Sequence, residues 1–443
     1  MHPVASRRRS PSWFSAVSCK AILGEFYSMT TTLRFGTDSE VLLDLPPERL
    51  VASCGQPDCE PVDDLSAAVA AGLISPLDFP PLTQCVLPDD RVAIVLDPEL
   101  PAWEDLLAGA ISGLLEARVA AENLTIVVGG EVEHDSLAAR VREVTDDTIT
   151  VVRHNSEERS ELAFLGTTTE GKGVYLNRTI VDAEFVLPIG CLRLDSMAGY
   201  HGVHGVLYPT FADEETRQRF RAPSNEEWAA HRRRRREETE QAARLLGVLL
   251  TIQVVPGGSG EVLQVLVGAP EAVARKGREI CEAVWHQEVP RRAELVVAAI
   301  EGDSSCQTWS NVTRALAAAN GAVTDDGAIA ICTELASPPG PALRRLVEAR
   351  DYEATLLALQ KDRSTDAAAA TLLLHLLSVR QVYFVSQLDE ETVEDLGMAP
   401  VRSVAELTRL ITRSESCLLI ANAQHAIATP AGEMAAPSHV ARQ

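Results

Sequence analysis

Short apolar runs alternate with helical segments along most of this chain, and this rhythm restricts the fold more than any other feature. Residues 91–96 and 124–128 have the composition of buried strands, and helical periodicity follows each of them, over 103–117 and 136–144. Neighbouring parallel strands need such a crossover helix, and the helices then cover both faces of the sheet. The pattern predicts an α/β fold built on parallel sheets.

The same rhythm extends to the end of the chain. Further strands are predicted at 39–45, 148–153, 173–176, 184–189, 251–255, 262–268, 295–300, 328–332, 382–386 and 416–421. Further helices are predicted at 65–73, 225–249, 270–287, 311–319, 341–349 and 404–414.

A chain of 443 residues is too long for one ordinary core, so we expect two domains. Residues 29–287 are assigned to an N-terminal α/β domain and residues 288–428 to a C-terminal α/β domain, both Rossmann-like with parallel sheets. The last strand could return to the first domain. This organisation predicts an interdomain cleft.

The two ends of the chain differ from the rest. Residues 1–28 contain three consecutive arginines but no continuous apolar segment of the kind that a secretory signal needs. We expect either a translation start at Met29 or a disordered leader. Residues 429–443 are rich in alanine and proline and are expected to be disordered.

The charge balance argues against nucleic acid as a partner. The formal net charge is −23, which repels a phosphate backbone. The dense basic run, 232–236, passes directly into the acidic run 237–240. Opposite charges three or four residues apart are typical of a solvated helix, which is how we interpret this segment.

Cysteine usage and hydropathy favour a cytoplasmic protein. The nine cysteines are scattered without the paired spacing of a metal site, as expected for reduced packing residues. No apolar run approaches the roughly 20 residues that cross a bilayer, so no membrane partner is expected.

A glycine-spaced segment, 198–209, follows the predicted buried strand that ends near Gly190, and we expect it to lead into a helix. Its histidines, His201 and His204, stand three residues apart and could share a helical face, offering two imidazoles to a transition metal. Two ligands still need a third from elsewhere. The alternative is that both side chains hydrogen-bond the loop or face solvent.

Several of these segments resemble the nickel-dependent lactate racemase family. Residues 97–101, Asp-Pro-Glu-Leu-Pro, are similar to the family's Asp-x-Thr-Arg-Pro, and 129–130 to the start of its Ala-Thr-Gly-Thr-His segment. Residues 198–209 resemble the loop whose lysine anchors a nickel-pincer nucleotide, and 308–316 resemble a substrate-side helix. The resemblance implies a two-domain α/β enzyme that oxidises a 2-hydroxy acid by transient hydride transfer and returns it in either configuration.

The positions that carry the family's chemistry are substituted. Gly205 stands at the anchoring lysine, and Leu100 at the arginine that holds the substrate carboxylate. The first acid–base histidine falls on Val132, with His134 two residues further on, and the second falls near Asp195. The metal-binding histidine is also missing, since 216–224 contains no histidine.

The resemblance and the remaining polar residues define the candidate site. The expected catalytic residues are Asp97, His134, Asp195 and His201. The expected cofactor-binding residues are Gly199, Gly202 and His204, with His201 and His204 as metal ligands. Asn311 and Arg314 stand where the family has an amide and a lysine, and they are the expected substrate-binding residues for an anion.

Three functions follow from these residues. The first is a lactate racemase-like protein that binds a small anionic metabolite or nucleotide in the cleft, with altered chemistry. The second is an isomerase, a nickel-pincer-dependent 2-hydroxy acid racemase or epimerase that uses His134 or His201 in new positions. The third is a non-catalytic scaffold or regulatory subunit, a pseudoenzyme whose cleft is packed around Leu100, Val132 and Val203.

Overall fold

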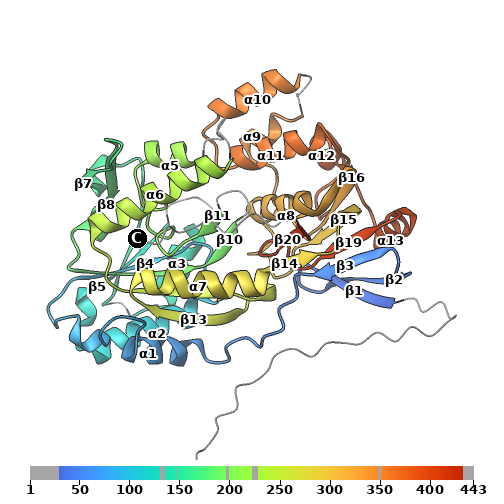
Figure 1. The fold of residues 1–443 in the computed structure, drawn as a ribbon. Coiled ribbons are helices and arrows are strands. Elements are labelled where there is room, and N and C mark those ends of the chain that lie inside the picture. The colour runs from blue at the N-terminus through green and yellow to red at the C-terminus, as the bar shows by residue number, and fades with distance from the viewer. Residues whose placement is uncertain are drawn as a thin grey trace, which may run out of the picture.

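The computed structural model describes residues 29–129, 135–146, 148–195, 199–221, 228–347 and 351–432. Two six-stranded sheets dominate it and lie side by side, each covered by helices (Figure 1). All neighbouring strands within them are parallel except one pair, so the predicted α/β fold with parallel sheets is confirmed. Within the described ranges, no helix is both long enough and apolar enough to cross a membrane.

The first sheet has the strand order β13-β12-β9-β4-β5-β6. Its strands are β4 (Val92–Leu96), β5 (Leu124–Val128), β6 (Thr150–Arg153), β9 (Phe185–Cys191), β12 (Thr251–Pro256) and β13 (Val262–Gly268). The edge strand β13 is antiparallel to β12. Every residue of the central strands β4 and β9 is buried, as a sheet covered on both faces requires.

Helices cover both faces of this sheet. The helices are α1 (Leu65–Ile74), α2 (Trp103–Glu116), α3 (Asp135–Val144), α4 (Arg178–Val181), α5 (Glu214–Arg221) and α6 (Trp228–Leu246). In Figure 1, α1 and α2 lie below the sheet, and α5 and α6 lie above it. Ile94 packs toward α1 and α2, whereas its neighbour Val95 packs against Leu207 and Phe211 on the other face. Alternate side chains of β4 therefore pack into two apolar cores, one on each face of the sheet.

The second sheet has the order β18-β17-β16-β15-β19-β3 and is parallel throughout. Its strands are β3 (Leu50–Cys54), β15 (Ala293–Ala299), β16 (Val323–Cys332), β17 (Val382–Val385), β18 (Ala399–Pro400) and β19 (Cys417–Ile420). The hairpin of β1 (Met29–Phe35) and β2 (Ser39–Leu45) packs on one face together with α13 (Val404–Arg413).

The opposite face carries the remaining helices. They are α8 (Trp309–Ala322), α9 (Pro341–Arg344), α10 (Tyr352–Lys361), α11 (Ala367–Leu377) and α12 (Glu390–Asp395), whereas α7 (Pro270–Trp285) packs on the first sheet. Helix α7 joins the two halves of the molecule, because it contacts β12 and β13 while Trp285 belongs to the same apolar cluster as Val296 of β15. The halves therefore share a core.

The connections between the halves differ from the expected ones. The last strand of the second sheet, β19, pairs with β15 and β3 and so stays in that sheet. It is β3, early in the chain, that leaves the first half. Gly55 follows β3 with a φ of 83°, and a Cβ there would lie 1.8 Å from the carbonyl oxygen of Ala421. A small parallel pair joins β14 (His286–Val289) to β20 (Ile427–Pro430), so the expectation that disorder starts at residue 429 is wrong for 429–430.

Three predicted helices also need correction. The helix predicted at 270–287 ends at Trp285, because the backbone continues as β14. The helix predicted at 341–349 ends at Arg344. The segment after β9 forms a hairpin of β10 (Arg193–Asp195) and β11 (Gly199–His201), followed by turns, and the next helix, α5, starts only at Glu214. A second hairpin, β7 (Leu162–Thr167) with β8 (Gly173–Asn177), lies beside α6.

Candidate functional site

A cavity of about 740 Å³ opens at the carboxyl ends of strands in the first sheet. Asp97 and Glu99 follow β4, Gly129 follows β5, and Arg193 follows β9, and all four line the cavity. Residues of α5, α6 and α7 form the opposite wall, and Arg314 of α8 closes one end. Carboxyl ends of parallel strands are where open α/β sheets bind ligands, so this cavity is the candidate site.

The described lining of the cavity is rich in arginine. Its arginines are Arg193, Arg217, Arg235, Arg236, Arg244, Arg278 and Arg314. Its carboxylates are Asp97, Glu99, Glu240 and Glu271. The described lining therefore has seven arginines against four acidic residues, in a chain whose formal net charge is −23. Such a local inversion of charge favours an anionic ligand.

Asp97 lies at the floor of the cavity and is fully committed to protein contacts. One carboxylate oxygen accepts hydrogen bonds from Arg193 Nη2 at 3.0 Å and from the Cys191 backbone N–H at 3.2 Å. The other oxygen accepts from the Glu99 backbone N–H at 2.9 Å. Asp97 is 5 % exposed. These contacts make it a residue that shapes the turn after β4 and fixes Arg193.

Glu99 joins this floor to the second half of the molecule. Its Oε2 accepts hydrogen bonds from Arg193 Nη1 at 2.5 Å and from Arg314 Nη2 at 2.9 Å. Arg314 also donates to Asn311 Oδ1 at 2.6 Å. Helix α8 presents both residues because Thr308 caps it by accepting a hydrogen bond from the Asn311 backbone N–H. The structure thus brings Asp97, Asn311 and Arg314 together, as expected of one site.

His204 lines the same cavity, together with Gly202. Burial lowers the pKa of His204 to about 4, with a smaller lowering by Arg244 that Glu271 opposes. The imidazole is therefore neutral at neutral pH. The His204 carbonyl oxygen accepts from the backbone N–H groups of Leu207 and Tyr208, so the residue lies in a turn.

The expected helical pair of His201 and His204 is wrong in its geometry. His201 ends β11, opposite Arg193, and His204 lies in the turn that follows, so no helical face carries both residues. Gly199 pairs with Asp195 across the same hairpin. The side chains of Asp195 and His201 lie outside the described part of the structure, as does the whole of His134.

Two observations bear on metal and cofactor binding. Among the described residues, no group of three histidine, cysteine, aspartate or glutamate side chains lies close enough to hold a metal ion. The described lining of the cavity contains Gly205 and one histidine, His204, but no lysine. A cofactor anchored through lysine and held by several imidazoles does not fit these donors.

Leu100 stands at the expected position of a carboxylate-binding arginine, but it does not line the cavity. It is 5 % exposed and packs in the apolar core between the first sheet and helices α1 and α2, beside Trp103 and Leu106. Val203, in contrast, is buried and does line the cavity. The position after Glu99 therefore points away from any ligand.

The basic run at the start of α6 is divided between solvent and the cavity. Arg233 is 81 % exposed and pairs with Glu237 at 3.5 Å, as predicted for a solvated helix. Arg235 and Arg236 line the cavity, which corrects that interpretation for two of the five arginines. Because successive helical residues are about 100° apart, five adjacent arginines cannot all face solvent on a packed helix.

A buried polar cluster supports this wall of the cavity. Glu238 accepts a hydrogen bond from Tyr208 Oη at 2.7 Å, and Arg219 donates to both of its carboxylate oxygens. Phe220 lines the cavity, with the Arg235 guanidinium 5.7 Å from its ring centroid and the Tyr208 ring edge-on at 5.4 Å. The cluster ties α5 to α6.

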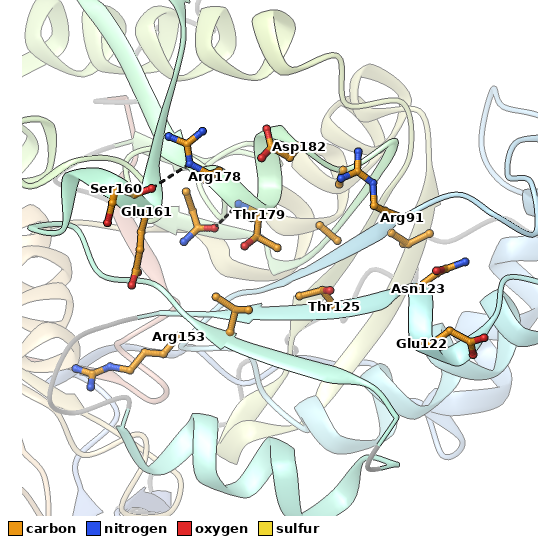
Figure 2. Close-up of a pocket in the computed structure, with 15 residues that line it drawn as sticks. Arg91, Glu122, Asn123, Thr125, Arg153, Ser160, Glu161, Arg178, Thr179 and Asp182 are labelled. Atoms are coloured by element: carbon orange, nitrogen blue, oxygen red, sulfur yellow. Dashed lines mark hydrogen bonds between the residues drawn. The ribbon is translucent and has the colours of Figure 1, made fainter.

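A second cavity, of about 610 Å³, lies near the amino ends of β4 and β5. Figure 2 shows that its arginine side chains, Arg91, Arg153 and Arg178, point in different directions and do not converge. Arg178 donates to the carbonyl oxygens of Ser160 and Leu162, at 3.0 and 2.8 Å. Its polar groups thus brace the surrounding loops, and we do not assign a ligand to this cavity.

Sequence reasoning missed most of the cationic groups of the site. Arg193 had a signal, because it stands two residues beyond a buried parallel strand, where ligand-binding residues gather. No sequence signal marked Arg235, Arg236 or Arg278, since a helical arginine that lines a cavity has the same local sequence pattern as one that faces solvent.

Comparisons with known proteins agree with the fold. Residues 35–239 match the model of the lactate racemase N-terminal domain. The lactate racemase apoprotein from Thermoanaerobacterium thermosaccharolyticum is similar with 20 % identity and a TM-score of 0.74, over 90 % of this chain and 100 % of that one. A Thermotoga maritima protein is similar with 13 % identity and a TM-score of 0.59, over 84 % of this chain and 100 % of that one. A search of the curated proteins finds no match.

Proposed function

We propose that the cavity binds a small phosphate-bearing anion, of the nucleotide class. Residues 35–239 match the lactate racemase N-terminal domain, but the proposed binding does not use that family's lysine-anchored chemistry. The observation that carries the proposal is the arginine-rich wall formed by Arg217 of α5, Arg235 and Arg236 of α6, and Arg278 of α7. Arginines from three separate helices line one cavity.

The chemistry of this wall favours phosphate. Guanidinium groups bind phosphate oxygens through paired, charge-assisted hydrogen bonds, each worth about 1.5–3 kcal/mol. Phe220 and Tyr208 add aromatic surface beside the arginines, as a ligand with a ring system requires. The neutral imidazole of His204 can accept or donate a hydrogen bond without adding charge.

The nickel-pincer nucleotide of the family does not fit the described residues, because Gly205 stands where the anchoring lysine is expected and the described lining contains one imidazole. We therefore derive no step through that group. The alternative isomerase depends on His134 or His201, and it stays a prediction that nickel analysis tests. The scaffold alternative expected a filled cleft, and an open cavity with Leu100 packed elsewhere favours ligand binding instead.

The test is calorimetric titration of the purified chain with inorganic pyrophosphate, AMP and ADP. We expect binding of at least one phosphate compound, weakened about 10-fold or more by Arg236→Gln and by Arg278→Gln, because each removes charge-assisted hydrogen bonds. Matched controls lie on the same helices. Arg233→Gln and Arg275→Gln remove exposed arginines that pair with Glu237 and Asp78 and do not line the cavity.

The controls should retain wild-type affinity. The proposal is wrong if no phosphate compound binds at millimolar concentration, or if the control variants weaken binding as much as the cavity variants do.

A further inference from the structure

The end of the cavity nearest the second sheet holds two arginines and a carboxylate from the chain itself. Arg193 and Arg314 come from opposite halves of the molecule, and both donate to the same oxygen of Glu99, at 2.5 and 2.9 Å. All three residues line the cavity. Two guanidinium groups that converge on one carboxylate oxygen make an anion-binding arrangement.

We propose that Glu99 is a specificity-determining residue, a built-in carboxylate that occupies the Arg193 and Arg314 guanidinium pair and excludes ligand carboxylates from this end of the cavity. The proposal rests on the proposed function only in placing the ligand in this cavity. It does not depend on how the ligand's phosphate is bound.

The charges at this end are balanced. Arg193 and Arg314 face Asp97 and Glu99, two cations against two anions, whereas the far wall keeps its excess of arginine. A ligand carboxylate has no net attraction to the balanced end. A ligand anion is therefore directed to the wall formed by α5, α6 and α7.

Covalent attachment makes Glu99 a strong competitor. A tethered carboxylate acts at an effective concentration in the millimolar range or above, which a free monocarboxylate must exceed. Arg193 is 6 % exposed and is also fixed by Asp97, so it cannot turn away to meet another anion. The Glu99 side chain is 41 % exposed, so solvent reaches the carboxylate that holds the two arginines.

The position of Glu99 in the chain agrees with this role. Asp97 accepts a hydrogen bond from the Glu99 backbone N–H, so the turn after β4 holds Glu99 in place. The next residue, Leu100, is buried in the core. The turn therefore presents a carboxylate to the cavity and turns the following side chain away from it.

The experiment is titration of wild-type and Glu99→Gln chains with glycolate and with each enantiomer of lactate. We expect the variant to bind these monocarboxylates at least 10-fold more tightly than the wild type, because Arg314 loses its carboxylate partner and Arg193 loses one of its two. Glu99→Ala removes the side-chain oxygen that glutamine would keep, and its affinity for monocarboxylates should rise at least as much. A second substitution, Arg314→Gln, should abolish the gain in either background.

The matched control is Glu271→Gln, which removes another carboxylate from the lining of the same cavity without touching Arg193 or Arg314. The proposal is overturned if neither Glu99 variant gains affinity while its urea midpoint matches the wild type, or if Glu271→Gln gains as much. Failure of the phosphate titrations with a gain in Glu99→Gln would reject the proposed function alone. The reverse result would reject this inference alone.

Discussion

Arg219 of α5 donates to both carboxylate oxygens of Glu238 of α6, at 2.6 and 2.7 Å. Tyr208 donates to the same carboxylate, whose side chain is 7 % exposed. This contact fixes the relative position of two helices that carry Arg217, Arg235 and other cavity residues. This wall of the cavity therefore depends on an ion pair that does not itself line the cavity.

Replacing Glu238 with glutamine should lower the free energy of unfolding by about 2 kcal/mol, because the partly buried Arg219 loses its counter-charge. Urea denaturation measures the loss. Glu237→Gln, one residue earlier on α6, breaks an exposed pair with Arg233 and should cost less than about 0.5 kcal/mol. Equal losses in the two variants would mean that the buried pair has no special role.

The strand–helix rhythm was sufficient to predict the α/β fold, and the reason is physical. A strand buried on both faces, such as β4, is apolar throughout, and its pattern is readable without knowing its neighbours. The strand that pairs with β3 could not be predicted from such a local pattern. The residues of β3 contact β19, more than 360 positions away, as the hydrogen bond from Cys54 to the Leu419 carbonyl illustrates.

Restoring the family's arginine at Leu100 should not restore a carboxylate clamp. Leu100 packs in the core beside Trp103, so Leu100→Arg places a charged group among apolar side chains. We expect a loss of at least about 3 kcal/mol in the free energy of unfolding and no gain in lactate affinity. Leu100→Met, of similar volume, should cost less than about 1.5 kcal/mol. A folded Leu100→Arg chain that binds lactate would contradict this prediction.

Stability should fall in mild acid because His154 is buried as a neutral imidazole. Burial is the main cause that lowers its pKa from 6.5 to about 4. The unfolded chain therefore takes up a proton first as the pH falls, and the free energy of unfolding decreases between pH 6.5 and pH 4. By this linkage His154 alone should account for a decrease of about 2 kcal/mol between pH 7.5 and pH 5.

The measurement compares the two pH values within each protein by urea denaturation. His154→Gln loses contacts to Ala212 and Asn177 and should be less stable at pH 7.5, but its further decrease at pH 5 should be smaller by about 2 kcal/mol. An unchanged pH dependence in the variant would show that His154 does not stay neutral in the folded chain.

Co-expression with the enzymes that make the nickel-pincer nucleotide should leave the chain at its unmodified mass and without stoichiometric nickel. The reason is the lack of a lysine in the described lining around Gly205. Intact-mass spectrometry and elemental analysis are the measurements, with a lactate racemase expressed in parallel as the positive control. About one nickel per chain would favour the isomerase alternative and would point to His134 or His201 as ligands.

The candidate site was only partly predictable. Asp97, Asn311 and Arg314 could be named because their motifs survive, and the structure brings them into one network. Arg193 and Glu99 could not be identified in this way. They contact each other only because the ends of two strands, nearly a hundred residues apart in the chain, lie side by side in the sheet. Which arginine of a basic run enters a cavity depends on the angle at which its helix packs, and no local pattern records that angle.

The pairing of β3 with β19 has a consequence for biosynthesis. Strand β3 ends at Cys54, and its neighbour in the sheet, β19, begins at Cys417. During synthesis, the edge of β3 that pairs with β19 therefore stays unpaired until nearly the whole chain has left the ribosome. An exposed strand edge is a template for pairing with other chains. Nascent or truncated forms of this protein should therefore depend on chaperones far more than the finished molecule does.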